Sequence, residues 1–281
     1  MPGASDHHHL QGLNARELVG GLHDLGVRPG DTLMVHTSLK ALGPVTGGAE
    51  TVARAILDAV GPGGTVMAYC AWDRSPYEET LNGAILDPAE REAWPAFDPA
   101  TAGTYRGFGL LNEYLRKLPS ARRSAHPDAS MVAAGANADH LVRPHEFGAA
   151  FGPGSPLDRF RAAGGRVLLL GAPLDAVTVL HLAEALADIP RKRRVSYEMP
   201  ILEDGRKVWR RTEEFDSNGI LDGFAVEGEM DAVETIARLY VSEGHGIKGR
   251  IGGAQCHLLQ AADIVDYGVR WLERLFGPPG G

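Results

Sequence analysis

Short apolar runs alternate with amphipathic stretches in the first quarter of the chain. Residues 32–35 and 65–69 are almost wholly apolar, which is typical of strands buried on both faces. Residues 14–25 and 49–60 repeat their apolar positions at helical spacing, and the Gly-rich turn at 61–64 leads into the second strand. This order of strands and helices predicts a mostly parallel sheet covered by helices.

A second unit of this kind occupies residues 166–188. The run 167–170 predicts another buried strand, and a turn follows it. The carboxylate of Asp175 is suited to cap a helix that starts at residue 176 and ends before Pro190. Because ligands bind open α/β sheets at the carboxyl ends of strands, the turn lies where a binding site is expected.

The predicted helix carries a polar stripe on a mainly apolar surface. Thr178, His181, Glu184 and Asp188 fall near one face at helical spacing. Unpaired buried charge is costly, so a buried histidine flanked by carboxylates needs partners or a cavity. The stripe fits two interpretations: a core histidine capped by Glu184 for structural reasons, and a functional site.

The rest of the chain predicts further elements around these units. Residues 70–104 are long, acidic and aromatic, which is typical of a lid or binding loop. Two extended segments, 194–200 and 207–212, predict an antiparallel hairpin. Residues 213–229 are acidic and irregular, and 244–253 form a Gly-rich loop. We also expect helices at 107–118, 138–143, 157–163, 231–243 and 261–276, and a strand at 131–134.

Together these elements predict one α/β domain over residues 11–281. Its mixed, largely parallel central sheet lies between helices and carries a small antiparallel addition. Residues 1–10 are expected to be a flexible tail. The tract His7–His9 within it could bind metal or be a cloning remnant.

Composition narrows the function classes. The 281 residues carry a formal net charge of −8, which argues against nucleic-acid binding and suits a cationic ligand. No apolar run reaches the roughly 18 residues of a membrane helix, and the N-terminus lacks the apolar core of a signal peptide. The two cysteines, Cys70 and Cys256, are far apart in sequence, which fits a reducing cytoplasm.

Several motifs admit both a chemical and a structural interpretation. His36–Lys40 follows a strand and could hold a pyrophosphate or cap a loop, and the basic loop Arg122–Pro127 could hold a phosphate or lie at the surface. Gly244–Gly249 has the spacing of a dinucleotide fingerprint but lacks its βαβ context. His181 and Glu184 have no third ligand at zinc-site spacing, so we predict no metal site.

Taken in order, these pieces resemble the aminoglycoside 3-N-acetyltransferases, the antibiotic N-acetyltransferase family. The matching segments are MVHTSLKALGPVTGG (34–48), GPGGTVM (61–67), RRSAHPDASMVAAG (122–135), LLLGAPLDAVTVLHLAE (168–184), ILEDGRKVW (201–209), TEEFD (212–216) and VRWLERLFG (269–277). The ordered set, rather than any single motif, carries the resemblance. It implies the fold of this family, a mixed sheet between helices that differs from the other widespread acetyltransferase fold.

The resemblance also implies an activity. It is the transfer of an acetyl group from acetyl-CoA to the 3-amino group of the 2-deoxystreptamine ring of aminoglycosides, which confers antibiotic resistance. His181 matches the family's catalytic histidine and is the expected general base for direct attack in a ternary complex. Glu184 or Glu214 could hold its tautomer, Asp216 matches a nearby acid, and Thr178 could bond the thioester.

The ligand contacts expected from this resemblance fall into two groups. Those to the coenzyme are His36, Thr37, Ser38, Leu39, Lys40, Val45, Thr46, Ser124 and Thr178. Those to the polycationic drug are Tyr69, Trp72, Asp73, Glu78, Glu79, Asp188, Glu214 and Asp216. No metal, nucleic acid or membrane is expected as a partner, and the protein is expected to be a monomer or homodimer.

Two other function classes stay open. An acetyl-CoA-dependent N-acyltransferase for a non-antibiotic amine would carry the same site. A non-catalytic aminoglycoside-binding protein would bind drug without releasing thiol, although His181 with acids beside it argues against this class. A covalent route through Cys70 is disfavoured, because no paired histidine is evident in the sequence.

Overall fold

The computed structural model of the protein describes residues 12–190, 192–216 and 231–278. The expected tail at 1–10 and the part of the expected irregular segment from 217 to 229 lie outside these residues. Within the described residues, no helix is long and apolar enough to cross a membrane.

A seven-stranded mixed sheet lies at the centre of the fold, in the order β3-β4-β2-β1-β5-β9-β8. Its strands are β1 (Thr32–Thr37), β2 (Thr65–Tyr69), β3 (Arg122–Arg123), β4 (Met131–Gly135), β5 (Arg166–Leu170), β8 (Ile247–Ile251) and β9 (Ala254–Gln260). β1 pairs in parallel with β2 and β5, and the outer pairings in the described chain are antiparallel. The predicted mixed sheet is confirmed, with its parallel pairing at the centre.

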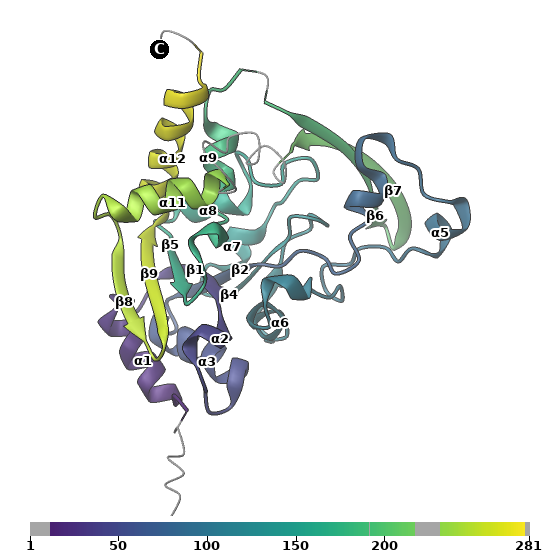
Figure 1. Ribbon diagram of the computed structural model, residues 1–281. Coiled ribbons are helices and arrows are strands. Elements are labelled where there is room, and N and C mark those ends of the chain that lie inside the picture. Colours follow the sequence, from purple (N-terminus) through teal and green to yellow (C-terminus); the bar gives the residue numbers. More distant parts are fainter. Residues whose placement is uncertain (1–11, 191, 217–230, 279–281) are drawn as a thin grey trace, which may run out of the picture.

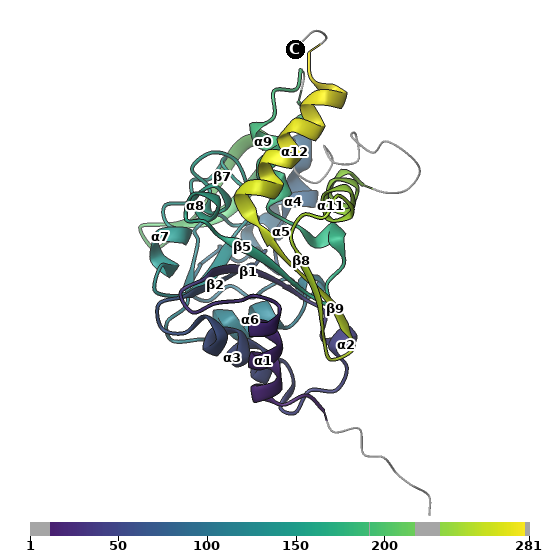
Figure 2. The same ribbon diagram turned by 90° about the vertical axis from the view of Figure 1, so that its left-hand side faces the viewer.

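Alternation along the strands gives this sheet two apolar faces. On β1, Leu33 and Val35 enter one core and Met34 enters the other. The first face is covered by α1 (Ala15–Asp24), α2 (Leu39–Leu42), α3 (Gly48–Val60) and α6 (Leu111–Arg116). The second is covered by α7 (Ala138–Val142), α8 (Pro156–Ala162), α9 (Leu180–Leu186), α11 (Ala232–Ser242) and α12 (Ala261–Phe276). Figure 2 shows the helices above and below the sheet.

The predicted antiparallel hairpin is also confirmed. It consists of β6 (Arg194–Glu203) and β7 (Arg206–Phe215), which form a sheet of their own. The turn residues Asp204 and Gly205 both have positive φ, 48° and 75°, as a two-residue hairpin turn requires. The hairpin extends away from the main sheet (Figure 1).

The long segment 70–104 packs against this hairpin. It contains α4 (Tyr77–Thr80), a 3₁₀ turn at Leu81–Gly83 and α5 (Pro88–Ala93). α4 and the turn contact β6, and α5 lies beside the hairpin in Figure 1. The ring of Tyr77 lies 4.9 Å from that of Tyr197 on β6. The segment is therefore a structural partner of the hairpin, and its own short helices replace the expected irregular loop.

Two other expectations are wrong. Half of the predicted Gly-rich loop at 244–253 is strand β8, which pairs with the unpredicted β9. β8 is an edge strand with mostly exposed side chains, so its sequence lacks the apolar alternation that marks a strand. The helix predicted at 107–118 is shortened to α6, because a 3₁₀ turn at Arg106–Phe108 ends at Gly109, where φ is 93°.

A buried arginine joins the segment 70–104 to the sheet. Arg123 on β3 donates hydrogen bonds to the carbonyl oxygens of Cys70 (2.6 Å) and Ala102 (2.5 Å) and to Ser130 Oγ (3.0 Å). Burial lowers the pKa of Arg123. The Cys70 carbonyl also accepts from the Ser130 hydroxyl (2.6 Å), but removal of the guanidinium would leave the carbonyl oxygens of Ala102 and Gly103 without this donor. The side chain is therefore expected to hold the segment in place.

We expect Arg123→Met to lower the free energy of unfolding by about 3 kcal/mol, since it leaves several buried acceptors unsatisfied. Urea-induced unfolding measures this change. The matched control is Arg210→Met, which removes an exposed ion pair with Glu203 and should leave the unfolding midpoint where it is. Equal midpoints for the two variants would contradict the proposed role of Arg123.

Candidate active site

The carboxyl ends of the three parallel strands meet at one edge of the sheet. β1 ends at Thr37, β2 at Tyr69 and β5 at Leu170. The Ser38 amide donates to the Leu170 carbonyl (3.0 Å), and Thr37 forms a bridge with Gly171. The two loops singled out in the sequence are therefore neighbours at the edge where ligands bind in open α/β sheets.

The helix after β5 is shorter than predicted. Residues Leu174–Ala176 form a 3₁₀ turn, and α9 begins only at Leu180. Asp175 is therefore not the N-cap of α9. The amide of His181 donates to the Thr178 carbonyl (3.0 Å), as part of a tight turn that satisfies the first amides of the helix without a side-chain cap.

α9 is held closely against α12. Leu182 and Ala183 are fully buried. Gly268 on α12 permits the close approach, because a Cβ at that position would lie 2.9 Å from Leu180 and 3.0 Å from Ala183. This packing fixes the position of the helix and so of His181.

His181 and Glu184 face each other on α9. Nδ1 of His181 lies 3.5 Å from Oε2 of Glu184, and the ring of Phe151 stacks on the imidazole at 4.9 Å. Glu184 is 2% exposed, and its oxygens have no hydrogen-bond donor among the described residues. Burial raises the pKa of Glu184, and His181 opposes this shift. Of the two candidate carboxylates, Glu184 is the one that faces Nδ1.

A cavity of about 120 Å³ opens beside this pair. Its walls include His181 and Glu184 from α9, Ala150 and Phe151 from the loop before α8, and Glu214 from β7. The fold thus brings three of the predicted catalytic residues to one cavity, although they come from elements far apart in sequence.

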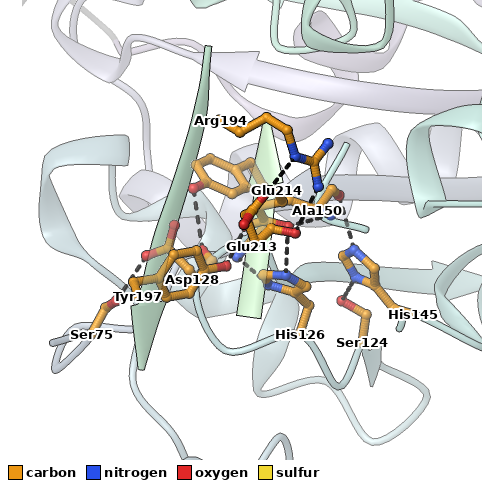
Figure 3. Close-up of polar contacts among 12 residues, drawn as sticks. Ser75, Ser124, His126, Asp128, His145, Ala150, Arg194, Tyr197, Glu213 and Glu214 are labelled. Atoms are coloured by element: carbon orange, nitrogen blue, oxygen red, sulfur yellow. Dashed lines mark hydrogen bonds and ion pairs between the residues drawn. The ribbon is translucent and has the colours of Figure 1, made fainter. Parts of the chain in front are cut away.

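Glu214 is the second carboxylate of this cavity (Figure 3). It accepts a hydrogen bond from the Ala150 amide (3.0 Å) and another from the Tyr197 hydroxyl. Nε2 of His126 lies 3.5 Å from Oε2 of Glu214. Burial by itself would raise the pKa of Glu214, but His126, Tyr197 and Ala150 outweigh burial and lower it. Glu214 therefore gives the cavity a negatively charged wall.

Two further predicted acids do not line this cavity. Asp216 is buried and forms an ion pair with Arg193. Asp188 is exposed and lies beyond the end of α9, where its amide donates to Glu273 of α12 (2.9 Å). Because the helix stops before Asp188, this residue does not continue the polar stripe that the sequence predicts.

Most residues expected to contact coenzyme lie along the edge formed by β1 and α2. His36 Nε2 and Thr37 Oγ1 are buried, and neither has a hydrogen-bond partner in the described part of the chain. Burial lowers the pKa of His36 to about 4. Such atoms favour a bound ligand, because unsatisfied buried polar groups are costly. Ser38 caps α2, Lys40 and Thr46 are exposed, and Leu39, Val45 and Thr178 are half-buried.

Ser124, also expected at the coenzyme, lies beside Met131, which pairs with Tyr69 at the carboxyl end of β2. Its side chain is fully buried, and its hydroxyl oxygen accepts a hydrogen bond from the Met131 amide (2.9 Å). The same hydroxyl lies 2.9 Å from Nδ1 of His145. Ser124 is thus part of an internal hydrogen-bond network.

The aromatic side chains expected at the drug differ in their placement. Trp72 is 4% exposed and packs edge-on against Phe97 at 5.4 Å, so it has no free face for a sugar ring. Tyr69 is half-buried, and its ring lies 5.9 Å from that of Phe151. Because Phe151 stacks on His181, Tyr69 does lie close to the cavity.

The predicted acids of the segment 70–104 lie outside the His181 cavity. Asp73 is exposed and lines a different cavity, of about 350 Å³, together with Glu113. Glu78 and Glu79 are exposed on α4. Burial raises the pKa of Asp128, and Glu78 adds to that shift, so Glu78 contributes negative charge near the group around Glu214.

Four residues around Glu214 were not predicted as site residues: His126, Asp128, His145 and Tyr197. Both histidines are buried, with their rings 4.9 Å apart (Figure 3). The basic loop in which His126 lies is therefore largely internal, not a surface phosphate loop. The sequence did contain a signal for these buried groups. His126 and Asp128 lie directly before an apolar strand, and polar side chains at such a position are buried together with the strand.

This arrangement defines a class of site. An imidazole opens on a cavity, a buried carboxylate lies behind it, and a second carboxylate lines the cavity wall. It is suited to remove a proton from a cationic amine. Burial raises the pKa of the Cys70 thiol to about 11, which makes this cysteine a poor nucleophile. The described residues contain no group of His, Cys, Asp and Glu that could hold a metal ion.

The chain matches known proteins over most of its length. The family model for aminoglycoside 3-N-acetyltransferase matches residues 34–273. Aminoglycoside N(3)-acetyltransferase III of Salmonella sp is 62% identical over 263 residues, which cover 93% of this chain and 92% of the relative. The protein therefore belongs to the aminoglycoside 3-N-acetyltransferase family.

Two solved structures share the fold. AAC-VIa bound to sisomicin has a TM-score of 0.90 and 51% identity, over 95% of this chain and 100% of that chain. AAC-IIIb in a binary structure with CoASH has a TM-score of 0.88 and 41% identity, over 95% of this chain and 99% of that chain.

Because Glu184 is buried, we expect the site to lower the free energy of unfolding. A carboxyl group whose pKa is raised in the folded state destabilises the fold as pH rises above its unfolded pKa. We therefore expect Glu184→Gln to melt at a higher temperature than the wild type at pH 8, by about 2–4 °C for each kcal/mol relieved. The difference should vanish near pH 4, where the wild-type carboxyl is protonated. The exposed Glu213→Gln is the control, and a stabilisation independent of pH would contradict this explanation.

Proposed function

We propose that the protein transfers the acetyl group of acetyl-CoA to the 3-amino group of the 2-deoxystreptamine ring of aminoglycosides. The observation that carries this proposal is the cavity shared by His181, Glu184 and Glu214 beside the carboxyl ends of the parallel strands. The relatives named for this reaction, and the structures with CoASH and sisomicin, support the two substrates. The expected cytoplasmic location is part of this proposal.

In this reaction His181 is the general base. Its Nδ1 faces Glu184, which leaves Nε2 to take a proton from the attacking amine. The amine reacts as neutral –NH2, after its ammonium form has lost one proton to solvent. Its lone pair attacks the thioester carbonyl carbon while His181 takes one of the two N–H protons. The tetrahedral adduct then breaks its C–S bond, and the imidazolium returns that proton to the leaving thiolate. Glu184 stabilises the imidazolium while it carries that proton.

The coenzyme lies along the edge of β1 and α2. The buried atoms His36 Nε2 and Thr37 Oγ1 lack partners within the described chain and are suited to its polar groups. The exposed Lys40 ammonium can bind a phosphate. Thr178, whose carbonyl accepts the His181 amide, lies between this edge and the base and can bond the thioester.

The amine enters from the acidic side. Glu214 in the cavity wall, with Asp216 beside it, attracts the ammonium groups of the drug. A cavity of about 120 Å³ is smaller than the ~300 Å³ at the low end of ligand pockets, so it receives the reacting ring rather than the whole drug. The other rings then extend over the surface near Glu78.

We expect His181→Ala to lower kcat by about 10²–10⁴-fold, because the amine loses its base. Thiol release from acetyl-CoA, with gentamicin, kanamycin and neomycin as acceptors, measures this loss. Drug binding, followed by calorimetry, should be largely retained in the variant.

The exposed His140→Ala on α7 is the matched control and should turn over like the wild type. Unchanged turnover in His181→Ala would remove this residue as the base. If the wild type released no thiol with any of the three drugs, the function would shift to acetylation of another amine. Drug binding without thiol release would indicate a binding protein.

A further inference from the structure

The cavity wall contains a second histidine–carboxylate pair. His126 Nε2 lies 3.5 Å from Glu214 Oε2, the same separation as between His181 and Glu184. The order of the two groups is reversed, however. In the first pair the carboxylate supports a histidine at the cavity, whereas in the second the fully buried His126 supports a carboxylate that lines the cavity.

A main-chain amide sets the proton position on His126. The Ala129 amide donates to Nδ1 (3.0 Å), so the neutral ring carries its proton on Nε2, toward Glu214. The nearby Asp128 carboxylate accepts instead from Ser75 (2.7 Å). His126 is thus committed to Glu214, and a separation of 3.5 Å can shorten on ligand binding, as active-site hydrogen bonds do.

The contacts of Glu214 leave it one acceptor position. A carboxylate has roughly four lone-pair positions. The Tyr197 hydroxyl takes one on Oε1 and the Ala150 amide takes one on Oε2. His126 Nε2 faces Oε2 at 3.5 Å and would take a third as that distance shortens. One N–H of a cationic ligand in the cavity can therefore be accepted without displacing a protein donor.

The loop beside His181 is tied to the same network (Figure 3). The Ala150 amide donates to Glu214, and the Ala150 carbonyl accepts from Nε2 of His145 (2.9 Å). Nδ1 of the same histidine accepts from the Ser124 hydroxyl (2.9 Å). Burial lowers the pKa of His145 to about 2, so this ring stays neutral. The next residue, Phe151, stacks on the base. The carboxylate and the base are thus positioned from one framework.

We infer that His126 is a positioning residue: it holds Glu214 toward the cavity so that this carboxylate receives an ammonium group of the aminoglycoside, while acetyl-CoA binding does not depend on it. The inference rests on the proposed function, since it assumes that the amine enters the His181 cavity. The two histidines then have separate tasks, because His181 moves the proton and His126 fixes the amine through Glu214.

The surroundings of Glu214 make this role measurable by pH. The charged or titratable groups that face it, besides His126, are Tyr69, Tyr77, Asp128 and Tyr197, with His181, Glu184 and Arg194 lining the same cavity. Burial raises the pKa of Glu214, and His126 is the strongest of the groups that lower it. Without His126 the strongest of these lowering interactions is lost, and the pKa of Glu214 rises.

Two substitutions of His126 distinguish the role of its N–H donor from the role of its ring. His126→Phe keeps a ring and removes the N–H, whereas His126→Gln keeps an N–H donor. For His126→Phe we expect the KM for gentamicin to rise about tenfold, as for the loss of one charge-assisted hydrogen bond, while the KM for acetyl-CoA changes less than about twofold. The acid limb of kcat/KM for the drug should move to higher pH. His126→Gln should recover most of both effects.

The exposed His140→Gln is the control and should change neither KM nor the pH profile. The inference is overturned if both KM values rise together with a lower melting temperature, because that pattern marks a merely structural role. It is also overturned if the acid limb stays in place, or if His126→Gln behaves like His126→Phe.

Calorimetric titration with gentamicin alone separates this inference from the proposed function. If the wild type binds the drug without releasing thiol, the proposed function fails, and weaker binding by His126→Phe still supports the positioning role. If the wild type turns over and His126→Phe binds and turns over equally well, the positioning role alone is overturned. If the wild type neither binds nor acetylates gentamicin, kanamycin or neomycin, both are overturned.

Discussion

A carboxylate buried without a hydrogen-bond donor is the constraint on which the site depends. Glu184 lies on the buried side of α9, and one of its carboxylate oxygens faces the imidazole of His181 at 3.5 Å. Burial of a carboxylate costs free energy unless its charge is paired and hydrogen-bonded. The close packing of α9 on α12, made possible by Gly268, keeps Glu184 dry and keeps His181 beside it. Stability is lost here so that the base stays oriented.

The second carboxylate has the opposite hydrogen-bonding environment. Glu214 is also buried, but it is surrounded by donors from three separate elements, so its pKa falls where that of Glu184 rises. One cavity therefore holds two carboxylates with different tasks. Burial raises the pKa of Glu184, which has no donors, and His181 opposes that shift. Glu214, which has donors, remains an anion. This contrast follows from tertiary contacts, because the two glutamates are identical as residues.

The long segment 70–104 illustrates how burial changes an interpretation. Its acidic and aromatic composition predicts a lid over a cationic drug. In the fold its aromatic side chains are used for packing instead: Trp72 lies against Phe97, and Tyr77 lies against Tyr197 of the hairpin. A sequence shows that aromatic and acidic residues are present, but it does not show which of them cover a neighbouring element.

Local patterns in the sequence determined the central strands, the hairpin and the His181–Glu184 pair. The strands are short apolar runs, the hairpin consists of two extended segments close in sequence, and the pair lies one helical turn apart. The strand β8 escaped this reasoning, since an exposed edge strand has no apolar period. Only the tertiary structure decided which glutamate faces His181 and that His126 lies behind Glu214. Those contacts join segments distant in the chain, and their distances depend on how the helices and the hairpin pack, which no local spacing encodes.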